Sequence, residues 1–157
     1  MFRWLLIDGY NLMHADPDFR DRRGGTFESR RTQFVSHVAK LAPLTAHRAT
    51  LVFDGRAAAQ EPAVRETRGP MDILYSSGSR SADGEIERLV HQDPRPEGIV
   101  VVTDDLAEQD SVRAAGAHVL GCAAWLEECR QRERDAVRRC RRRKPFRSPR
   151  LGDLFPE

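Results

Sequence analysis

Short apolar segments alternate with longer amphipathic ones along the chain. Runs of strand length lie at residues 2–7, 50–53, 71–75, 99–102 and 118–120. Stretches with apolar residues at helical spacing lie at 26–43, 82–91 and 105–115, and a long one begins near residue 123. Continuous β-branched runs that alternate with helices are typical of a parallel sheet covered on both faces. The pattern therefore predicts an α/β fold, a three-layer α/β/α sandwich around a parallel sheet of about five strands.

Two segments show no regular period and are expected to be loops. Residues 9–25 are rich in Asp, Arg and Gly, and residues 56–70 are polar. Thr26 is the expected cap of the helix that follows the first loop, and Pro43 is its expected end.

Three of the predicted strands end at an aspartate, namely Asp8, Asp54 and Asp104. Each aspartate alone has an ordinary explanation, because Asp is frequent in turns and helix caps. Ligands of open parallel sheets bind beyond the carboxyl ends of the strands, so neighbouring strands would bring the three carboxylates together. Like charges at one site repel unless a cation neutralises them. The repeated ending therefore predicts a cation site.

Further acids extend this candidate metal site. Asp83 lies in the first turn of a predicted helix, Glu87 lies one turn later, and Asp105 follows Asp104. Asp83 and Asp105 are also residues that helix N-termini favour. Oxygen ligands without a His/Cys set favour Mg²⁺ or Mn²⁺ over zinc, and such ions serve phosphodiester hydrolysis. Neither a P-loop nor a G-x-G-x-x-G motif occurs, so no nucleotide cofactor is expected.

The formal charge of +2 hides a strong segregation of charge. Residues 130–150 hold eleven basic and two acidic side chains, whereas residues 1–129 are acidic overall. We therefore expect a domain at 1–129 and a basic helix and tail at 130–157. Basic and aromatic side chains together suit single-stranded RNA, although a solvated tail explains the same composition. The candidate RNA contacts are Arg22, Arg23, Arg138, Arg139, Arg141, Arg142, Arg143, Lys144 and Phe146.

Four motifs resemble those of NYN domains, specifically the YacP-like branch. Residues 8–14 read DGYNLMH, close to the first signature of that branch, and residues 52–55, 81–88 and 101–105 match its later motifs in order and spacing. The resemblance spans roughly residues 2–130. It implies a fold like those of PIN and flap nucleases, with a parallel sheet in the order 3-2-1-4-5 and an acidic metal site.

The resemblance also implies residue roles. Asp8, Asp83 and Asp104 would be the core metal ligands, and Asp54 would be a ligand or a supporting acid. Asn11 would position Asp8 or the scissile phosphate. The family often has Ser before Asp after its fourth strand, whereas this chain has Asp104 followed by Asp105. Either of these two aspartates could therefore face the metal.

The function expected from these observations is a Mg²⁺- or Mn²⁺-dependent endoribonuclease. Because the YacP-like branch includes a ribosome-associated enzyme that cleaves mRNA, the expected partners are mRNA and the ribosome. The alternative is a non-catalytic RNA- or ribosome-binding module on a nuclease fold, and a weaker one is a flap-type DNA nuclease. No apolar run approaches the roughly 18 residues of a membrane span, and no signal-peptide core is visible, so a cytoplasmic location is expected.

Overall fold

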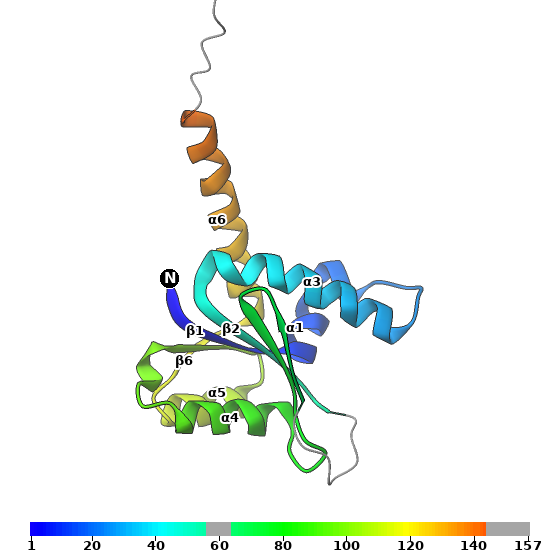
Figure 1. Cartoon of the computed structure of the whole chain (residues 1–157), viewed down its shortest axis with the longest axis vertical. Coiled ribbons are helices and arrows are strands. Elements are labelled where there is room, and N and C mark those ends of the chain that lie inside the picture. Colours follow the sequence, from blue (N-terminus) through cyan, green and yellow to red (C-terminus); the bar gives the residue numbers. More distant parts are fainter. Residues whose placement is uncertain (56–63, 144–157) are drawn as a thin grey trace, which may run out of the picture.

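The computed structural model describes residues 1–55 and 64–143, which contain a six-stranded sheet with the order β3-β4-β2-β1-β5-β6 (Figure 1). Five strands are parallel: β1 (Phe2–Asp8), β2 (Ala46–Phe53), β4 (Met71–Tyr75), β5 (Ile99–Val102) and β6 (His118–Leu120). An edge strand, β3 (Val64–Arg68), pairs antiparallel with β4. Counting only the five expected strands in chain order, the arrangement is 3-2-1-4-5, which confirms the order that the family resemblance implied.

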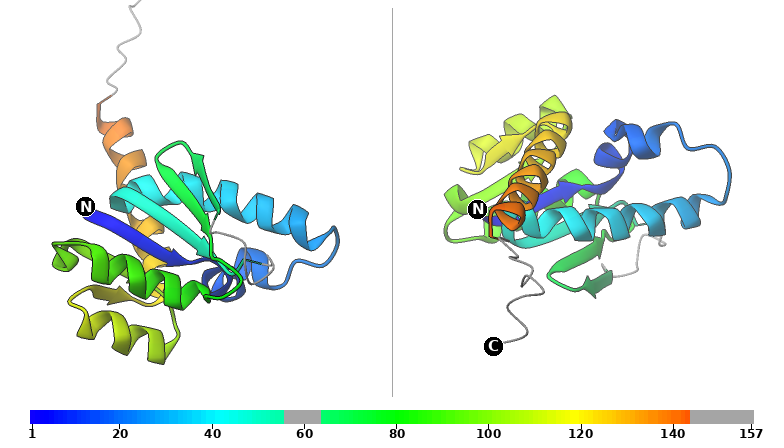
Figure 2. Two further views of the ribbon diagram at one scale, coloured as in Figure 1. Left: turned by 60° about the horizontal axis from the view of Figure 1, so that its bottom comes forward. Right: turned by 90° about the horizontal axis from the view of Figure 1, so that it is seen from above.

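Helices cover both faces of the sheet (Figure 2). One face carries α1 (Gly9–Ala15), α2 (Pro17–Arg20), α3 (Phe27–Thr45) and the start of α6 (Cys122–Arg142). The other face carries α4 (Ala82–Gln92) and α5 (Leu106–Ala114). A short 3₁₀ turn, η1 (Pro96–Gly98), leads into β5. The three-layer α/β/α architecture is confirmed.

Alternate residues of the central strands supply two separate cores. In β1, Leu5 and Ile7 pack towards α1, α3 and α6, whereas Trp4 and Leu6 pack towards α4 and α5. Successive side chains of a strand point to opposite faces, so a strand covered on both faces needs apolar residues throughout. This explains why the central strands are visible in the sequence as unbroken apolar runs.

Trp125 joins α6 to the rest of the domain. Its side chain is fully buried, and its indole Nε1–H donates to Oγ1 of Thr45, at the end of α3, over 3.1 Å. The buried positions of α6 end at Cys129, and beyond it the helix projects away from the sheet (Figure 1). The helix itself is continuous through residue 130, where the two expected parts of the chain meet.

Several expected boundaries were wrong. Residues 9–25 were expected to be a loop but contain α1 and α2. Helix α1 has only seven residues and begins with glycine, so it lacks the length and composition that mark helices in a sequence. Strand β2 begins at Ala46 rather than at residue 50, and α3 continues past Pro43 to Thr45. A proline in the last turn removes only one hydrogen bond of the helix.

The sheet also has a strand that the sequence did not predict. Every residue of β3 is exposed, so the strand has no buried face and no alternation of apolar and polar residues. The strand forms because its backbone pairs with β4. The sequence predicted a parallel sheet of about five strands, and the described part of the chain has five parallel strands and one antiparallel edge strand. Within that part, no helix combines the length and the apolar character required to cross a membrane.

Candidate active site

The carboxyl ends of β2, β1 and β5 lie side by side, because these strands are neighbours in the sheet. Asp8 is the last residue of β1, Asp54 follows β2, and Asp104 lies two residues after β5. The expected gathering of strand-terminal aspartates at one edge of the sheet is therefore what the topology produces.

Asp8 is the most buried of these three aspartates, and its Oδ1 caps α1 by accepting from the backbone N–H of Asn11 over 3.3 Å. Burial raises the pKa of Asp8, and the negative charges of Asp54 and Asp83 raise it further, against the lowering effect of the Asn11 hydrogen bond. Asp54 and Asp83 therefore lie close enough to Asp8 to act on it electrostatically.

Asp54 connects the end of β2 to the start of α4. Its Oδ1 accepts from the backbone N–H of Ala82, the residue before Asp83, over 2.5 Å. Ser81 caps the same helix by accepting from Gly84 N–H over 3.3 Å. Asp83 is thus held at the first turn of α4 by contacts on both sides of it in the sequence. Glu87, one turn later, instead pairs with His91 at 3.7 Å.

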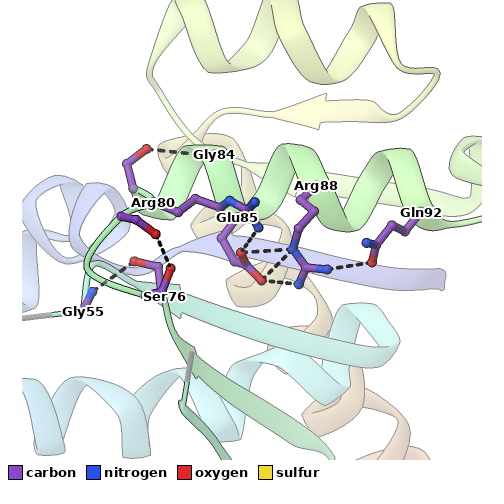
Figure 3. A network of polar contacts seen from close by, with 10 residues as sticks. Gly55, Ser76, Arg80, Gly84, Glu85, Arg88 and Gln92 are labelled. Atoms are coloured by element: carbon purple, nitrogen blue, oxygen red, sulfur yellow. Dashed lines mark hydrogen bonds and ion pairs between the residues drawn. The ribbon is translucent and has the colours of Figure 1, made fainter. Parts of the chain in front are cut away.

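An ion-pair network around one buried glutamate secures this first turn of α4 (Figure 3). Glu85 is only 2% exposed, and its carboxylate pairs with Arg80 at 3.2 Å and with Arg88. Arg88 also donates to Oε1 of Gln92 over 2.7 Å. Hydrogen bonds from Arg88 and Arg80 lower the pKa of Glu85, against the effect of its burial. Glu85 therefore supports α4, while its neighbour Asp83 remains exposed at the sheet edge.

Close contacts explain why glycine follows aspartate at Asp8-Gly9 and Asp54-Gly55. A Cβ on Gly9 would lie 2.4 Å from Cε1 of Phe53, and a Cβ on Gly55 would lie 1.8 Å from the carbonyl oxygen of Ser76. The N–H of Gly55 also donates to Oγ of Ser76 over 3.1 Å. Glycine is thus required at both positions by close approach, which brings the chain after each aspartate tightly against the neighbouring strand ends.

Glu108 is a site residue that the sequence analysis missed. It lies in the first turn of α5, is only 4% exposed, and accepts at Oε2 from Oγ1 of Thr103 over 2.7 Å. Its Oε1 is buried and receives no hydrogen bond from an N–H or O–H group in the described chain. Burial and the neighbouring carboxylate of Asp8 raise the pKa of Glu108 to about 8. The buried carboxyl group of Glu108 and the half-buried one of Asp8 therefore lie beside each other at the acidic edge.

The signal for Glu108 was present in the sequence but had a simpler explanation. Asp105 and Glu108 have the spacing of a helix capping box, which predicts a helix start and nothing more. Asp105 is indeed the N-cap of α5, with Oδ1 accepting from the N–H groups of Ala107 and Glu108 at 2.9 and 3.1 Å. Only the fold shows that Glu108 turns inward to Asp8.

Asn11 joins the loop after β5 to α6. Its Oδ1 accepts from the backbone N–H of Asp104 over 2.8 Å and from Sγ of Cys122 over 3.2 Å. Burial and nearby Asp104 raise the pKa of the Cys122 thiol to about 12, so it remains a donor. Asp104 itself accepts at Oδ1 from Cys122 N–H over 2.8 Å. The side chain of Asn11 thus positions the Asp104 loop, while its backbone contacts Asp8.

These acids fit a divalent cation that keeps part of its water shell. In residues 1–55 and 64–143, no three His, Cys, Asp or Glu side chains form a ready-made cage for a metal ion. Mg²⁺ is usually held by one or two carboxylates together with waters and substrate phosphates, so it does not need such a cage. The buried Oε1 of Glu108, without a donor and beside Asp8, is a suitable oxygen ligand.

The candidate RNA contacts lie in two places. Arg22 and Arg23 are both exposed, and the guanidinium of Arg22 also lies 4.4 Å from the Phe19 ring centroid and donates to Gln33 over 2.5 Å. The other described candidates are all exposed: Arg138, Arg139, Arg141 and Arg142 lie on α6, and Arg143 follows its last residue. Lys144 and Phe146 lie outside the described residues.

Comparisons with known proteins identify relatives in sequence and in fold. The chain is 28% identical over 139 residues to the uncharacterized protein YacP of Bacillus subtilis (strain 168), across 88% of this chain and 81% of YacP. It is also similar to two crystal structures of Rae1 (YacP) from Bacillus subtilis. One, of a point mutant, has a TM-score of 0.73 and 26% identity, with coverage of 93% of this chain and 86% of Rae1. The other has a TM-score of 0.67 and 27% identity, with coverage of 88% and 79%.

The family assignment rests on nearly the whole chain. A sequence model described as "YacP-like NYN domain" matches residues 5–155, which include the acidic edge and α6. The NYN domains form a PIN-like nuclease family, in agreement with the order of the sheet. The chain belongs to the YacP-like NYN domain family.

Proposed function

We propose that this protein is a divalent-metal-dependent endoribonuclease whose active site is the acidic edge of the sheet. The observation that carries the proposal is the adjacent pair of half-buried Asp8 and buried Glu108, flanked by Asp54 and Asp83. Burying adjacent carboxylates is unfavourable unless a cation offsets their repulsion, so a fold that does so is suited to hold one. Membership of a nuclease family supports the same chemistry.

The proposed roles follow from the contacts of each residue. Asp8 and Glu108 would hold Mg²⁺ or Mn²⁺, with Asp83 and Asp104 close by, directly or through water. Such an ion lowers the pKa of a bound water and offsets charge on the phosphate. Asp54 fixes the start of α4 and Asn11 fixes the Asp104 loop. Asp105 Oδ1 accepts two N–H groups in capping α5, whereas Asp104 Oδ1 accepts one, from Cys122, so Asp104 is the better ligand of the two.

The proposed substrate is RNA, in particular mRNA, with the ribosome as partner. The acidic edge repels a phosphate chain, so another surface must attract it. The exposed arginines of α6 provide that surface, because phosphate contacts supply most of the affinity for nucleic acid. The resemblance to the YacP-like branch favours mRNA over other RNAs as the substrate. It also favours the ribosome as the partner.

Removing the metal tests the proposal. We expect purified protein to cut single-stranded RNA internally with Mg²⁺ or Mn²⁺, to lose all cleavage in EDTA, and to regain it when Mn²⁺ is restored. Calorimetric titration should also show Mn²⁺ binding that is lost in Asp8→Asn, a readout independent of cleavage. Intact RNAs and intact translating ribosomes after incubation with metal would contradict the proposal.

A second candidate is a non-catalytic RNA- or ribosome-binding module. The exposed arginines of α6 favour it, because phosphate contacts can hold RNA without a metal ion. Under this alternative, EDTA leaves RNA binding unchanged, no RNA is cut with any metal, and Asp8→Asn has no effect in cells.

Neutralising the α6 arginines should weaken RNA binding in a salt-dependent way. For single strands, the slope of log affinity against log salt falls by about 0.7 per lost phosphate contact. Replacing Arg138, Arg139 and Arg141 with glutamine should therefore reduce the slope by about 2, as measured by fluorescence anisotropy at several salt concentrations.

The matched control removes the same charge elsewhere. Arg68, Arg95 and Arg113 are exposed on other elements, and their replacement by glutamine should leave the slope unchanged. Equal slopes for the two triple variants would remove α6 from the RNA-binding surface.

A further inference from the structure

A pocket with aromatic walls lies directly beside the acidic edge. It has a volume of about 300 Å³ and is lined by Tyr10 and His14 of α1, Phe27 at the start of α3, and Asp54 and Gly55 after β2. We call these five residues the aromatic pocket. None of the roles proposed above uses Tyr10, His14 or Phe27.

The rings of this pocket are held in place by packing. Tyr10 lies with its ring centroid 4.9 Å from that of Phe53 and 5.6 Å from that of Phe27. Phe53 in turn stacks on Tyr75 at 5.8 Å. Tyr10 and Phe27 are both half-buried, so each ring is fixed by the protein and still partly accessible. A ring fixed in this way loses little entropy when it binds a flat ligand.

Two arginines of α3 flank the aromatic rings. The guanidinium of Arg31 lies 5.4 Å from the Tyr75 ring centroid, and its Nη1 donates to the Tyr10 hydroxyl over 3.5 Å. The guanidinium of Arg30 lies 6.0 Å from the Phe27 ring centroid. Aromatic rings with adjacent arginines are the combination that proteins use to bind unpaired bases and their phosphates.

The pocket shares a wall with the proposed active site. Asp54 lines it, and the charge of Asp54 also acts on Asp8. Tyr10 lies two residues after Asp8, and Gly9 between them allows α1 to approach Phe53 closely. A flat group bound against Tyr10 and Phe27 would therefore be next to the acidic edge.

We propose that the aromatic pocket binds one unstacked nucleobase of single-stranded RNA, next to the phosphate that is cleaved. The proposal rests on the proposed function and specifies its substrate as an RNA with at least one base out of a duplex. A volume of about 300 Å³ lies at the lower limit of typical ligand pockets, which suits one base rather than several. The flanking arginines would contact the adjoining phosphate.

The test measures base binding without cleavage. A short RNA that carries the fluorescent base 2-aminopurine is titrated with full-length protein in EDTA, because stacking on an aromatic ring quenches this fluorophore. Phe27→Leu removes one aromatic stacking surface, so it should weaken binding about tenfold and remove the quenching. Phe27→Trp should retain both, because it keeps an aromatic face.

Controls separate a lost pocket from a damaged fold. Phe2 is also half-buried but lies at the opposite end of β1, so Phe2→Leu should leave affinity and quenching unchanged. Each variant is checked by thermal unfolding, and Phe27→Trp gives a second reading if Phe27→Leu is unstable. Wild-type affinity and quenching in Phe27→Leu, or their loss in a folded Phe27→Trp, would overturn the proposal.

Two further comparisons distinguish binding of an RNA base from binding of a free nucleotide, and failure of the pocket proposal from failure of the nuclease proposal. Adenosine monophosphate carries the same kind of base, and displacement of the RNA by it at equal concentration would assign the pocket to a free nucleotide and overturn the proposal. Quenching without metal-dependent cleavage by the wild type would refute the nuclease function alone, and cleavage with unchanged KM in Phe27→Leu would refute the pocket alone.

Discussion

Replacing Asp8 with asparagine is expected to lower RNA cleavage at saturating Mg²⁺ by about 10³-fold or more. A metal ion contributes several kcal/mol of charge stabilisation in the transition state, and each 1.4 kcal/mol corresponds to about a tenfold change in rate. Asp8 is the carboxylate on which burial, Glu108, Asp54 and Asp83 all act, so its loss should affect the cation most. The measurement is single-turnover cleavage of a labelled RNA.

The same substitution should have the opposite effect on stability. Without metal, Asp8 is a half-buried carboxyl group beside other acids, and its raised pKa shows that the fold disfavours its charge. Asparagine removes that charge, so Asp8→Asn should unfold in EDTA at the same temperature as the wild type or a higher one. Mg²⁺ should stabilise the wild type and not the variant, because only a ligand of the native state raises stability.

A control separates the site from the general charge of the protein. Asp110 is 84% exposed on α5 and pairs only loosely with Arg113, at 3.8 Å, so Asp110→Asn changes the net charge equally without touching the acidic edge. It should cleave RNA like the wild type. An Asp8→Asn variant that keeps a tenth of the wild-type rate, or that loses activity because it unfolds, would contradict the assignment of Asp8.

Replacing Trp125 with alanine is expected to lower the free energy of unfolding by about 3–5 kcal/mol, the usual cost of deleting a fully buried large aromatic side chain. Trp125 is 0% exposed, and it joins α6 to the end of α3 through both packing and the hydrogen bond to Thr45. The measurement is urea denaturation followed by far-UV circular dichroism, which does not depend on the tryptophan itself.

A smaller change at Trp125 tests how much of this stability comes from its hydrogen bond to Thr45. Trp125→Phe keeps most of the ring volume and removes the indole N–H. The Thr45 hydroxyl, which still donates to the Ala42 carbonyl, then loses its buried donor, so the variant should cost only about 1–3 kcal/mol. A loss below about 1 kcal/mol in Trp125→Ala, well under the usual cost, would show that α6 is not anchored by this residue. Because Asp104 accepts from the first residue of α6, a loosened α6 should also reduce cleavage.

The central strands and the acidic edge could be predicted from the sequence for a specific reason. Strands covered on both faces must be apolar throughout, and the aspartates at their ends need only the strand order to be brought together. The apolar runs alone do not determine the order of the strands in the sheet. It came from the resemblance of residues 8–14 and the later motifs to the YacP-like family, and the sheet confirms it.

The features that were missed depend on contacts that form only in the folded chain. Strand β3 is exposed along its whole length and exists because β4 pairs with it. From the sequence, Glu108 is expected only to mark a helix start. Its position beside Asp8 follows from the packing of α5 in the folded chain. Tyr10 and Phe27 are 17 positions apart and become one pocket only because α1 and α3 pack together. Local propensity does not encode any of these three contacts.

The length of α6 makes its arginines electrically independent of the acidic edge. At 1.5 Å per residue, Arg138 and Arg142 lie about 24 and 30 Å along the helix from Cys122, which contacts Asp104. Physiological salt screens charges beyond about 8 Å, so these arginines cannot balance the carboxylates through solvent. The two regions can act together only through a strand long enough to reach both, and a short oligonucleotide would report on the acidic edge and the aromatic pocket alone.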